Sequence, residues 1–108
     1  MKPVVFRGKA LSAIKAFPVA ARREAGYQID RLQQGLDPVD WKPMPGVGRG
    51  VREIRIRQQG QFRVIYVSSL PREIVILHAF RKKTDKTRKA ELARARAALK
   101  DVQGDLST

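Results

Sequence analysis

The sequence predicts an α+β domain in which helices cover one small β-sheet. Three consecutive segments, Val51–Arg57, Phe62–Ser68 and Glu73–Phe80, have the composition or the alternation of β-strands. Only short turns separate them, which favours an antiparallel meander, and segments with helical spacing of apolar residues lie before and after. With 108 residues the chain is too short for two cores, so residues 1–108 are expected to form a single domain.

Each of the three strand segments has its own burial pattern. Val51–Arg57 alternates Ile54 and Ile56 with charged residues, as a half-buried strand does. Phe62–Ser68 is rich in β-branched and aromatic residues, which pack well on a pleated surface. Glu73–Phe80 is almost wholly apolar, which is typical of a strand covered on both faces.

The N-terminal third predicts one more strand and two helices. Pro3–Arg7 suits the edge of a sheet, because its proline has no N–H to donate. Helices over Lys9–Phe17 and 18–34 would form an α-hairpin packed on one face of the sheet, with Gly35 as the C-terminal cap. The apolar positions expected in this hairpin are Leu11, Ile14, Phe17, Ala21, Ala25, Ile29, Leu32 and Leu36.

The segment Asp37–Gly50 holds three prolines and three glycines, and it predicts a loop. A loop of this length is long for a small domain, and such loops often carry function. Trp41 and Met44 either plug the core or form a lip that faces a substrate, and the first interpretation is favoured.

A last helix is expected from about Thr87 to Gln103. Asp85 or Thr87 would be its N-cap, Gly104 would end it, and the residues beyond would fray. Its narrow apolar seam consists of Leu92, Ala95, Leu99 and Val102.

The charge balance is the strongest compositional signal. Lys and Arg number 23 against 10 Asp and Glu, a formal charge of +13, which favours a polyanionic partner such as nucleic acid, an acidic protein or an anionic membrane surface. The chain has no cysteine and one histidine, so no metal site and no cofactor are expected. No apolar run approaches the roughly 18 residues that span a bilayer, and no signal peptide begins the chain, so a cytoplasmic protein is expected.

Basic residues gather on the predicted sheet. Antiparallel pairing would bring basic residues of the first two meander strands together, close to a cluster that follows the third. Cations in this arrangement hold a phosphodiester and stabilise the extra negative charge of its transition state. They could equally form an ordinary solvated face, and composition does not decide whether binding leads to cleavage. The residues are Arg55, Arg57, Arg63, Arg81, Lys82 and Lys83.

Three further side chains are candidates for proton transfer. His78 carries an imidazole, a common general acid or base, Tyr66 has a phenolic proton, and Glu53 is the only carboxylate of its strand. Each also has a structural interpretation, as a core histidine, a core aromatic or the partner of a neighbouring arginine. By strand alternation, His78 is expected on the same face as Ile74, Ile76 and Phe80.

The order of elements and three motifs resemble the RelE/ParE toxin superfamily, and specifically its phage-derived HigB-like branch. The motifs are Val51–Arg57 (VREIRIR), Gln61–Tyr66 (QFRVIY) and, most specific, Ile76–Thr84 (ILHAFRKKT). The resemblance spans about residues 3 to 102. It implies a RelE-like fold: a small antiparallel, mixed sheet with an N-terminal α-hairpin on one face and a C-terminal helix.

The resemblance also implies a function. The chain would be the toxin of a type II toxin–antitoxin system, a ribosome-dependent endoribonuclease (mRNA interferase) that directs the ribose 2′-hydroxyl at the adjacent phosphate without a metal ion. Such a hydrolase inhibits translation. Its partners would be mRNA on the 70S ribosome and a cognate antitoxin, whose acidic or amphipathic segment is expected over the sheet or its basic rim.

Site residues follow from the same resemblance. Arg55 and Arg63 would contact and polarise the phosphate, while His78 and Tyr66 fall within matched motifs. No tyrosine follows Tyr66, although RelE-type relatives place an acid/base tyrosine near the C-terminus, so His78, a lysine or the ribosome would move the proton. The implied catalytic set is Arg55, Arg63, Lys82, Lys83, His78 and Tyr66, and the implied RNA-binding set is Arg57, Arg81 and Lys86.

Two rival functions are consistent with the same sequence. One is a ParE-like toxin that inhibits DNA gyrase by protein contact and has no nuclease site. The other is a basic RNA-binding module without catalysis. The QFRVIY strand fits either toxin, whereas the dense cations and the LHAFRKK block favour RNA.

Overall fold

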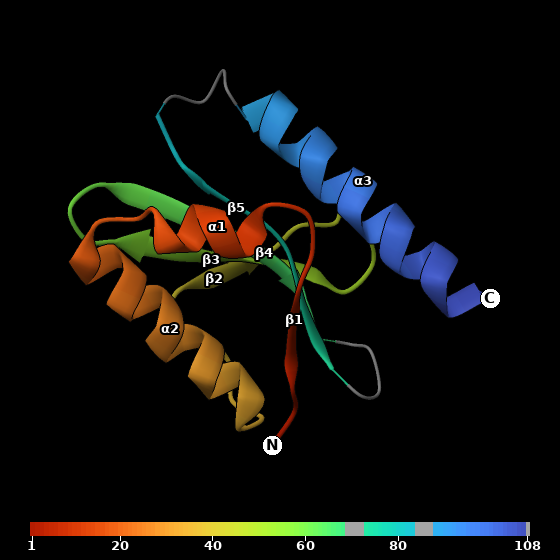
Figure 1. Ribbon diagram of the computed structural model, residues 1–108, viewed down its shortest axis with the longest axis horizontal. Helices are drawn as coiled ribbons and strands as arrows, with labels where there is room; N and C mark the ends of the chain where they lie inside the picture. The colour runs from red at the N-terminus through yellow and green to blue at the C-terminus, as the bar shows by residue number, and fades with distance from the viewer. Residues whose placement is uncertain (69–72, 84–87, 108) are drawn as a thin grey trace.

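The computed structural model describes residues 1–68, 73–83 and 88–107. They form an α+β fold with one five-stranded sheet of strand order β1-β5-β4-β3-β2, which confirms the predicted class (Figure 1). The sheet is mixed, because β1 pairs parallel with β5 and every other pair is antiparallel. The elements are β1 (Val4–Phe6), α1 (Ala10–Lys15), α2 (Val19–Gln33), β2 (Trp41–Pro43), β3 (Val51–Arg57), β4 (Gln61–Val67), β5 (Ile74–Arg81) and α3 (Arg88–Ser107).

Helices α1 and α2 cover one side of the sheet, here called the α-hairpin face. Ile14 and Phe17, with the predicted stripe of α2, are buried against strand residues such as Ile54 and Ile76. Two predicted core positions are wrong. Leu11 lies on the outer side of the short α1, and Leu36 follows Gly35, whose positive φ of 83° turns the chain away from the core.

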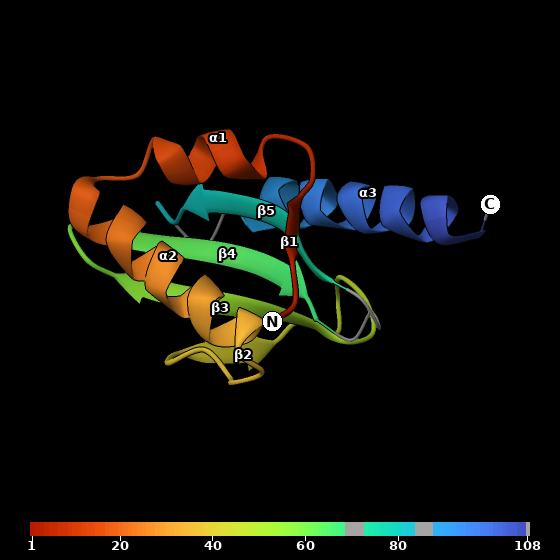
Figure 2. The same ribbon diagram turned by 60° about the horizontal axis from the view of Figure 1, so that its bottom comes forward.

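Helix α3 covers the other side, here called the α3 face (Figure 2). Its predicted seam is confirmed, since Ala95, Leu99 and Val102 are buried and Leu92 packs against them. Because each outer helix buries an apolar stripe on a different face, β5 is covered on both sides, as its apolar sequence predicted.

The predicted loop Asp37–Gly50 contains a strand that the sequence did not reveal. Residues Trp41–Pro43 form β2, the edge strand paired antiparallel with β3. Pro43 is tolerated there because an edge strand has one unpaired side. Gln28 of α2 fixes the entry to this strand, since its side-chain oxygen accepts hydrogen bonds from the backbone N–H groups of Val39 and Asp40.

Met44 and Val47, which follow β2, pack on the core. Met44 is buried in the α3-face cluster, as the favoured interpretation predicted. Trp41 is half-buried, and the Arg52 guanidinium lies 4.0 Å from its ring centroid. Gly48 passes so close to α3 that a β-carbon there would overlap the Leu99 side chain.

A register shift in the β4–β5 pairing changes the predicted position of His78. Ile65 pairs with His78 but Tyr66 pairs with Ile76, so the alternation of β5 is interrupted at Leu77. His78 therefore lies on the α3 face with Phe80. The prediction that it shares a face with Ile74 and Ile76 is wrong, because both of these belong to the α-hairpin core.

Helix α3 also runs further than predicted. It continues through Gly104 to Ser107, so the expected end at Gly104 is wrong. A glycine within a helix costs only about 1 kcal/mol, and Gly104 itself does not take the positive φ that commonly ends a helix. The proposed N-caps Asp85 and Thr87, and Lys86, lie outside the described residues.

Candidate functional site

Two arginines from neighbouring strands form the centre of the site. Arg55 of β3 lies directly opposite Arg63 of β4, so both side chains leave the sheet on the α3 face. Arg57, opposite Gln61, continues the same row toward the β3–β4 turn. Arg63 is only 4% exposed, whereas Arg55 is half-buried. The pairing therefore juxtaposes the two cations that the sequence singled out for phosphate contact.

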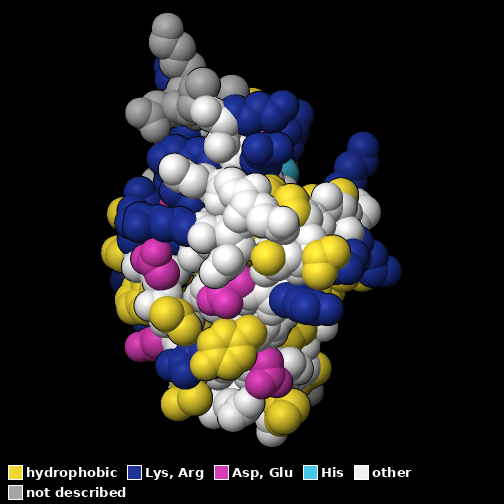
Figure 3. Space-filling view, turned by 90° about the vertical axis from the view of Figure 1, so that its left-hand side faces the viewer, with side chains coloured by type: hydrophobic (Ala, Val, Ile, Leu, Met, Phe, Trp, Pro, Cys, Tyr) yellow, Lys and Arg dark blue, Asp and Glu magenta, His cyan; other side chains and the backbone are white. Residues whose placement is uncertain are grey.

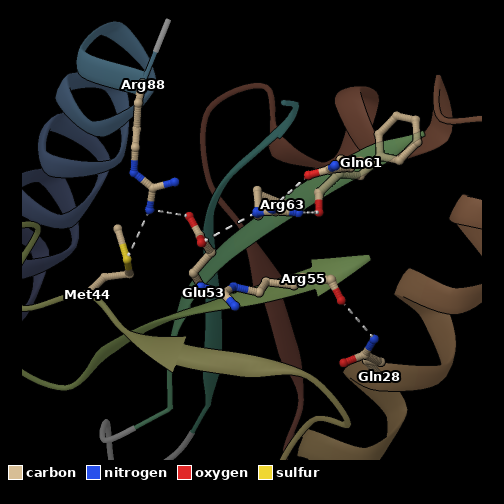
Figure 4. Close-up of polar contacts among 8 residues, drawn as sticks. Gln28, Met44, Glu53, Arg55, Gln61, Arg63 and Arg88 are labelled. Atoms are coloured by element: carbon tan, nitrogen blue, oxygen red, sulfur yellow. Dashed lines mark hydrogen bonds and ion pairs between the residues drawn. The ribbon is translucent and has the colours of Figure 1, made fainter. Parts of the chain in front are cut away.

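A buried carboxylate holds this centre together. Glu53 is fully buried, and its Oε1 lies 3.6 Å from Nε of Arg63. Its Oε2 accepts a hydrogen bond of 2.9 Å from Nη2 of Arg88, the first residue of α3. Figure 4 shows Arg88 reaching from α3 and Arg63 from β4 toward the same carboxylate. Glu53 thus has the structural role of an arginine partner, one of the two alternatives that the sequence left open.

Arg63 is further fixed by its own strand. Its Nη1 donates to the Phe62 carbonyl at 3.0 Å, and its Nη2 donates to the side-chain oxygen of Gln61 at 3.3 Å. Burial lowers the pKa of Arg63. The negative charge of Glu53 raises this pKa, and the positive charges of Arg55, Arg57 and Arg88 lower it further. The guanidinium remains protonated because its ordinary pKa lies far above neutral pH. The site therefore carries an excess of positive charge that an anion would neutralise.

Arg88 belongs to the candidate site, and the sequence analysis did not single it out for that role. A signal for it existed, because a cation in the first turn of a helix faces the positive end of the helix dipole. An anionic partner offsets this repulsion, and the carboxylate of Glu53 is that partner.

Lys42 is the second residue that was missed. It lies opposite Glu53 across the β2–β3 ladder and therefore also on the α3 face. Burial lowers the pKa of Lys42 from the ordinary 10.5, and the charge of Arg88 lowers it as well. Arg55 and Lys82 have smaller effects in the same direction, whereas the charge of Glu53 raises this pKa. No signal in the sequence could have found it, because β2 itself was predicted to be loop.

The other predicted catalytic residues are distributed over both faces. His78 is half-buried, contacts the Glu91 carboxylate of α3, and its ring centroid lies 5.6 Å from that of Phe80. Lys82 is half-buried and acts electrostatically on Lys42, and Lys83 is exposed. The structure thus brings Lys82 to the cations of the α3 face, while His78 joins β5 to α3.

Tyr66 and Arg81 lie on the opposite side of the sheet. Tyr66 is fully buried in the α-hairpin core, and burial raises the pKa of its hydroxyl. Arg81 pairs with Phe62 in the ladder, and its guanidinium carbon lies 5.8 Å from the centroid of that ring. The structure does not bring these two residues to the face that carries Arg55 and Arg63.

Basic side chains extend beyond the site to the molecular surface. On the face shown in Figure 3, most Lys and Arg side chains gather in the upper half, at the height where β5 ends and α3 begins. The visible Asp and Glu side chains lie lower. Such a basic surface is consistent with the formal charge of +13.

Two other features concern metals and membranes. Among residues 1–68, 73–83 and 88–107, no three His, Asp or Glu side chains are grouped as metal ligands would be. None of the helices in those residues combines the length and the apolar character needed to cross a bilayer.

Fold and charge together define a small basic α+β domain with a cationic sheet face beneath its C-terminal helix. A family model described as "Phage derived protein Gp49-like (DUF891)" matches residues 12–100, so the chain belongs to this family of phage-derived proteins. The family is associated with RelE-like, toxin-like proteins. No curated protein matches the sequence.

Proposed function

We propose that the protein is the toxin of a type II toxin–antitoxin system, of the HigB-like branch of the RelE/ParE superfamily, and that it cuts mRNA on the ribosome. One observation carries this proposal: Arg55 and Arg63 oppose each other on a face where Lys42, Lys82 and Arg88 add charge. The Glu53 carboxylate is paired with two of these cations, Arg63 and Arg88. Membership of a phage-derived family associated with toxin-like proteins supports the same assignment.

The arrangement suits an intramolecular transesterification. The ribose 2′-oxygen attacks the adjacent phosphorus, the bond from phosphorus to the 5′-oxygen breaks, and a 2′,3′-cyclic phosphate and a 5′-hydroxyl result. A guanidinium grips two phosphate oxygens with its planar fork, and fixed cations stabilise the charge that develops on them. In this scheme Arg55 and Arg63 bind the scissile phosphate. Glu53 pairs with Arg63, and Arg88 in turn holds Glu53.

The basic surface has two ligands in this proposal. Phosphates of ribosome-bound mRNA are one, because they are neutralised by Lys and Arg in a salt-dependent way. The other is a cognate antitoxin whose acidic or amphipathic segment covers the basic rim and so blocks the RNA. Co-expression with the product of a neighbouring gene, followed by affinity capture, is expected to recover a complex and restore growth.

Primer extension on a defined mRNA tests the activity, with translating ribosomes present or absent. The wild-type protein is expected to produce discrete cleavage sites only on ribosome-bound mRNA. Arg55→Ala is expected to slow cleavage by about 10²–10³-fold, the usual loss when one charge-stabilising donor is removed. Arg23→Ala is the matched control, because it removes the same charge from an exposed position of α2 and is expected to leave cleavage unchanged.

Two results would contradict the proposal. Intact mRNA on translating ribosomes, together with blocked DNA replication in cells, would instead identify a gyrase inhibitor. Equal cleavage by Arg55→Ala and the wild type would show that the reaction takes place elsewhere on the molecule.

A further inference from the structure

We infer that Lys42 is the proton donor of the proposed cleavage, and that its ammonium protonates the 5′-oxygen of the leaving nucleotide. The inference rests on the proposed function and extends it to a residue of the edge strand β2. It also supplies an acid where the sequence analysis left His78, a lysine or the ribosome as alternatives.

The position of Lys42 is the first argument. Directly opposed residues of an antiparallel pair point to the same face, so Lys42, opposite Glu53, shares the α3 face with Arg55 and Arg63. Because Lys42 lies on the edge strand β2 and is half-buried, part of it is open to solvent, whereas Arg63 is almost completely covered. RNA that reaches the arginines from the sheet edge therefore meets Lys42 beside them.

The surroundings of Lys42 are the second argument. Four charged groups act on it: Glu53 and Arg55 from β3, Arg88 from α3, and Lys82 from the segment after β5. Both oxygens of Glu53, the single anion in this set, are already engaged by Arg63 and Arg88. Within the described part of the chain, no ion pair or hydrogen bond holds the Lys42 ammonium. Its proton is therefore less tightly held than that of a lysine paired with a carboxylate.

The chemistry of the neighbouring side chains is the third argument. A guanidinium stays protonated in proteins, so Arg55, Arg63 and Arg88 can stabilise charge but cannot transfer a proton. His78 is engaged by Glu91 of α3, and Tyr66 lies on the other face of the sheet. An ammonium whose pKa is lowered by burial and by nearby cations is a better acid than an ordinary lysine.

The step balances without any further reactant. The bond from the 2′-oxygen to phosphorus forms and the bond from phosphorus to the 5′-oxygen breaks, while a proton moves from the Lys42 ammonium to that 5′-oxygen. The proton of the 2′-hydroxyl passes to solvent, and solvent returns one to the Lys42 amine. Atoms, electrons and charge therefore balance, and the only net change over the cycle is the cleavage of the phosphodiester.

A substrate with sulfur in place of the 5′-bridging oxygen gives a sharp test, because a thiolate leaves without being protonated. Two ribosome-bound mRNAs, one with each leaving atom at the cleavage site, are compared for the wild type and Lys42→Arg. The variant keeps the positive charge but cannot donate a proton. It is expected to cleave the oxygen substrate about 10²–10⁴-fold more slowly than the wild type. It is expected to cleave the sulfur substrate at nearly the wild-type rate.

Controls separate proton donation from folding and from charge. Lys15→Arg, at an exposed position of α1, makes the same chemical change away from the site and should match the wild type on both substrates. Lys42→Gln, whose side chain is no larger than that of lysine, provides a second variant should the larger arginine disturb β2, and it should show the same sulfur rescue. The wild-type rate should fall as the pH approaches the lowered pKa of Lys42, and this fall should be absent in both Lys42 variants.

The inference is overturned if Lys42→Arg cleaves the oxygen substrate at the wild-type rate, or if it is slowed equally on both substrates. It is also overturned if Lys82→Arg shows the sulfur rescue in its place. A wild-type protein that cleaves neither substrate overturns the proposed function itself, so the two failures are distinguishable.

Discussion

Helices cover both faces of the sheet, but they contact them in different ways. Helices α1 and α2 meet the α-hairpin face through one apolar core. Helix α3 meets its face through apolar residues from Ala95 to Val102 and through charged contacts in its first turn. In that turn, Arg88 binds Glu53 and Glu91 contacts His78. The same strand, β3, supplies isoleucines to one side and Glu53, Arg55 and Arg57 to the other.

This difference shows how a small domain can hold a costly charge cluster. Burying Arg63 and Glu53 removes both from water, and their attraction returns only part of that free energy. The apolar cores on both faces supply the stability that the cluster does not. A charged site of this kind is retained for function more readily than for stability, which agrees with the proposed role in binding RNA.

The largest expected effect on stability comes from removing Glu53, the anion at the centre of the charged contacts on the α3 face. Glu53→Ala leaves Arg63 buried without its carboxylate, and the free energy of unfolding should fall by about 3–5 kcal/mol. Urea unfolding followed by circular dichroism measures the change. Asp101→Ala, at an exposed position of α3, is the control and should stay within about 0.5 kcal/mol. A loss below about 1 kcal/mol for Glu53→Ala would show that the cluster is not an integral part of the fold.

An intermediate effect on stability should come from the apolar contacts of the α3 face. A β-carbon at Gly48 would overlap the Leu99 side chain, so Gly48→Ala should destabilise the protein by about 1–3 kcal/mol. Gly46→Ala is the matched control, because open space surrounds the corresponding position two residues away. Thermal unfolding of both variants measures the difference. Equal melting temperatures would contradict the close packing of this segment on α3.

The smallest effect concerns the α-hairpin face and appears only at alkaline pH. Burial raises the pKa of Tyr66 above 10.0, so the unfolded chain loses this proton at a lower pH than the native protein does. Stability conferred by the buried neutral hydroxyl is therefore complete below pH 10 and declines above it, by at most about 1.4 kcal/mol per pH unit. Urea unfolding between pH 9 and 11 should show this decline in the wild type but not in Tyr66→Phe.

Tyr27→Phe is the control for this comparison, since it removes the exposed tyrosine hydroxyl of α2. It should retain the wild-type decline in full. Parallel pH curves for the wild type and Tyr66→Phe would show that the Tyr66 hydroxyl is not protected by the α-hairpin core.

Local periodicity in the sequence was enough to determine most of the fold and part of the site. Alternation identified β3 and placed Arg55 and Arg57 on one side of it, and the short β3–β4 turn implied that Arg63 would join them. Spacings of three and four residues identified the seam of α3, and an unbroken apolar run identified β5 as doubly covered. These features depend on residues close together in the chain, where side-chain chemistry and backbone geometry act directly.

Only the tertiary structure decided which charged groups meet. Lys42 joined the site because an edge strand of three residues, too short to show a period, paired with β3. His78 changed faces because a register shift arises between two strands and leaves no mark in either one. Arg88 reached Glu53 because α3 packs over a face that its own sequence does not specify. Contacts between residues distant in sequence depend on how elements pack, and packing responds to the whole chain at once.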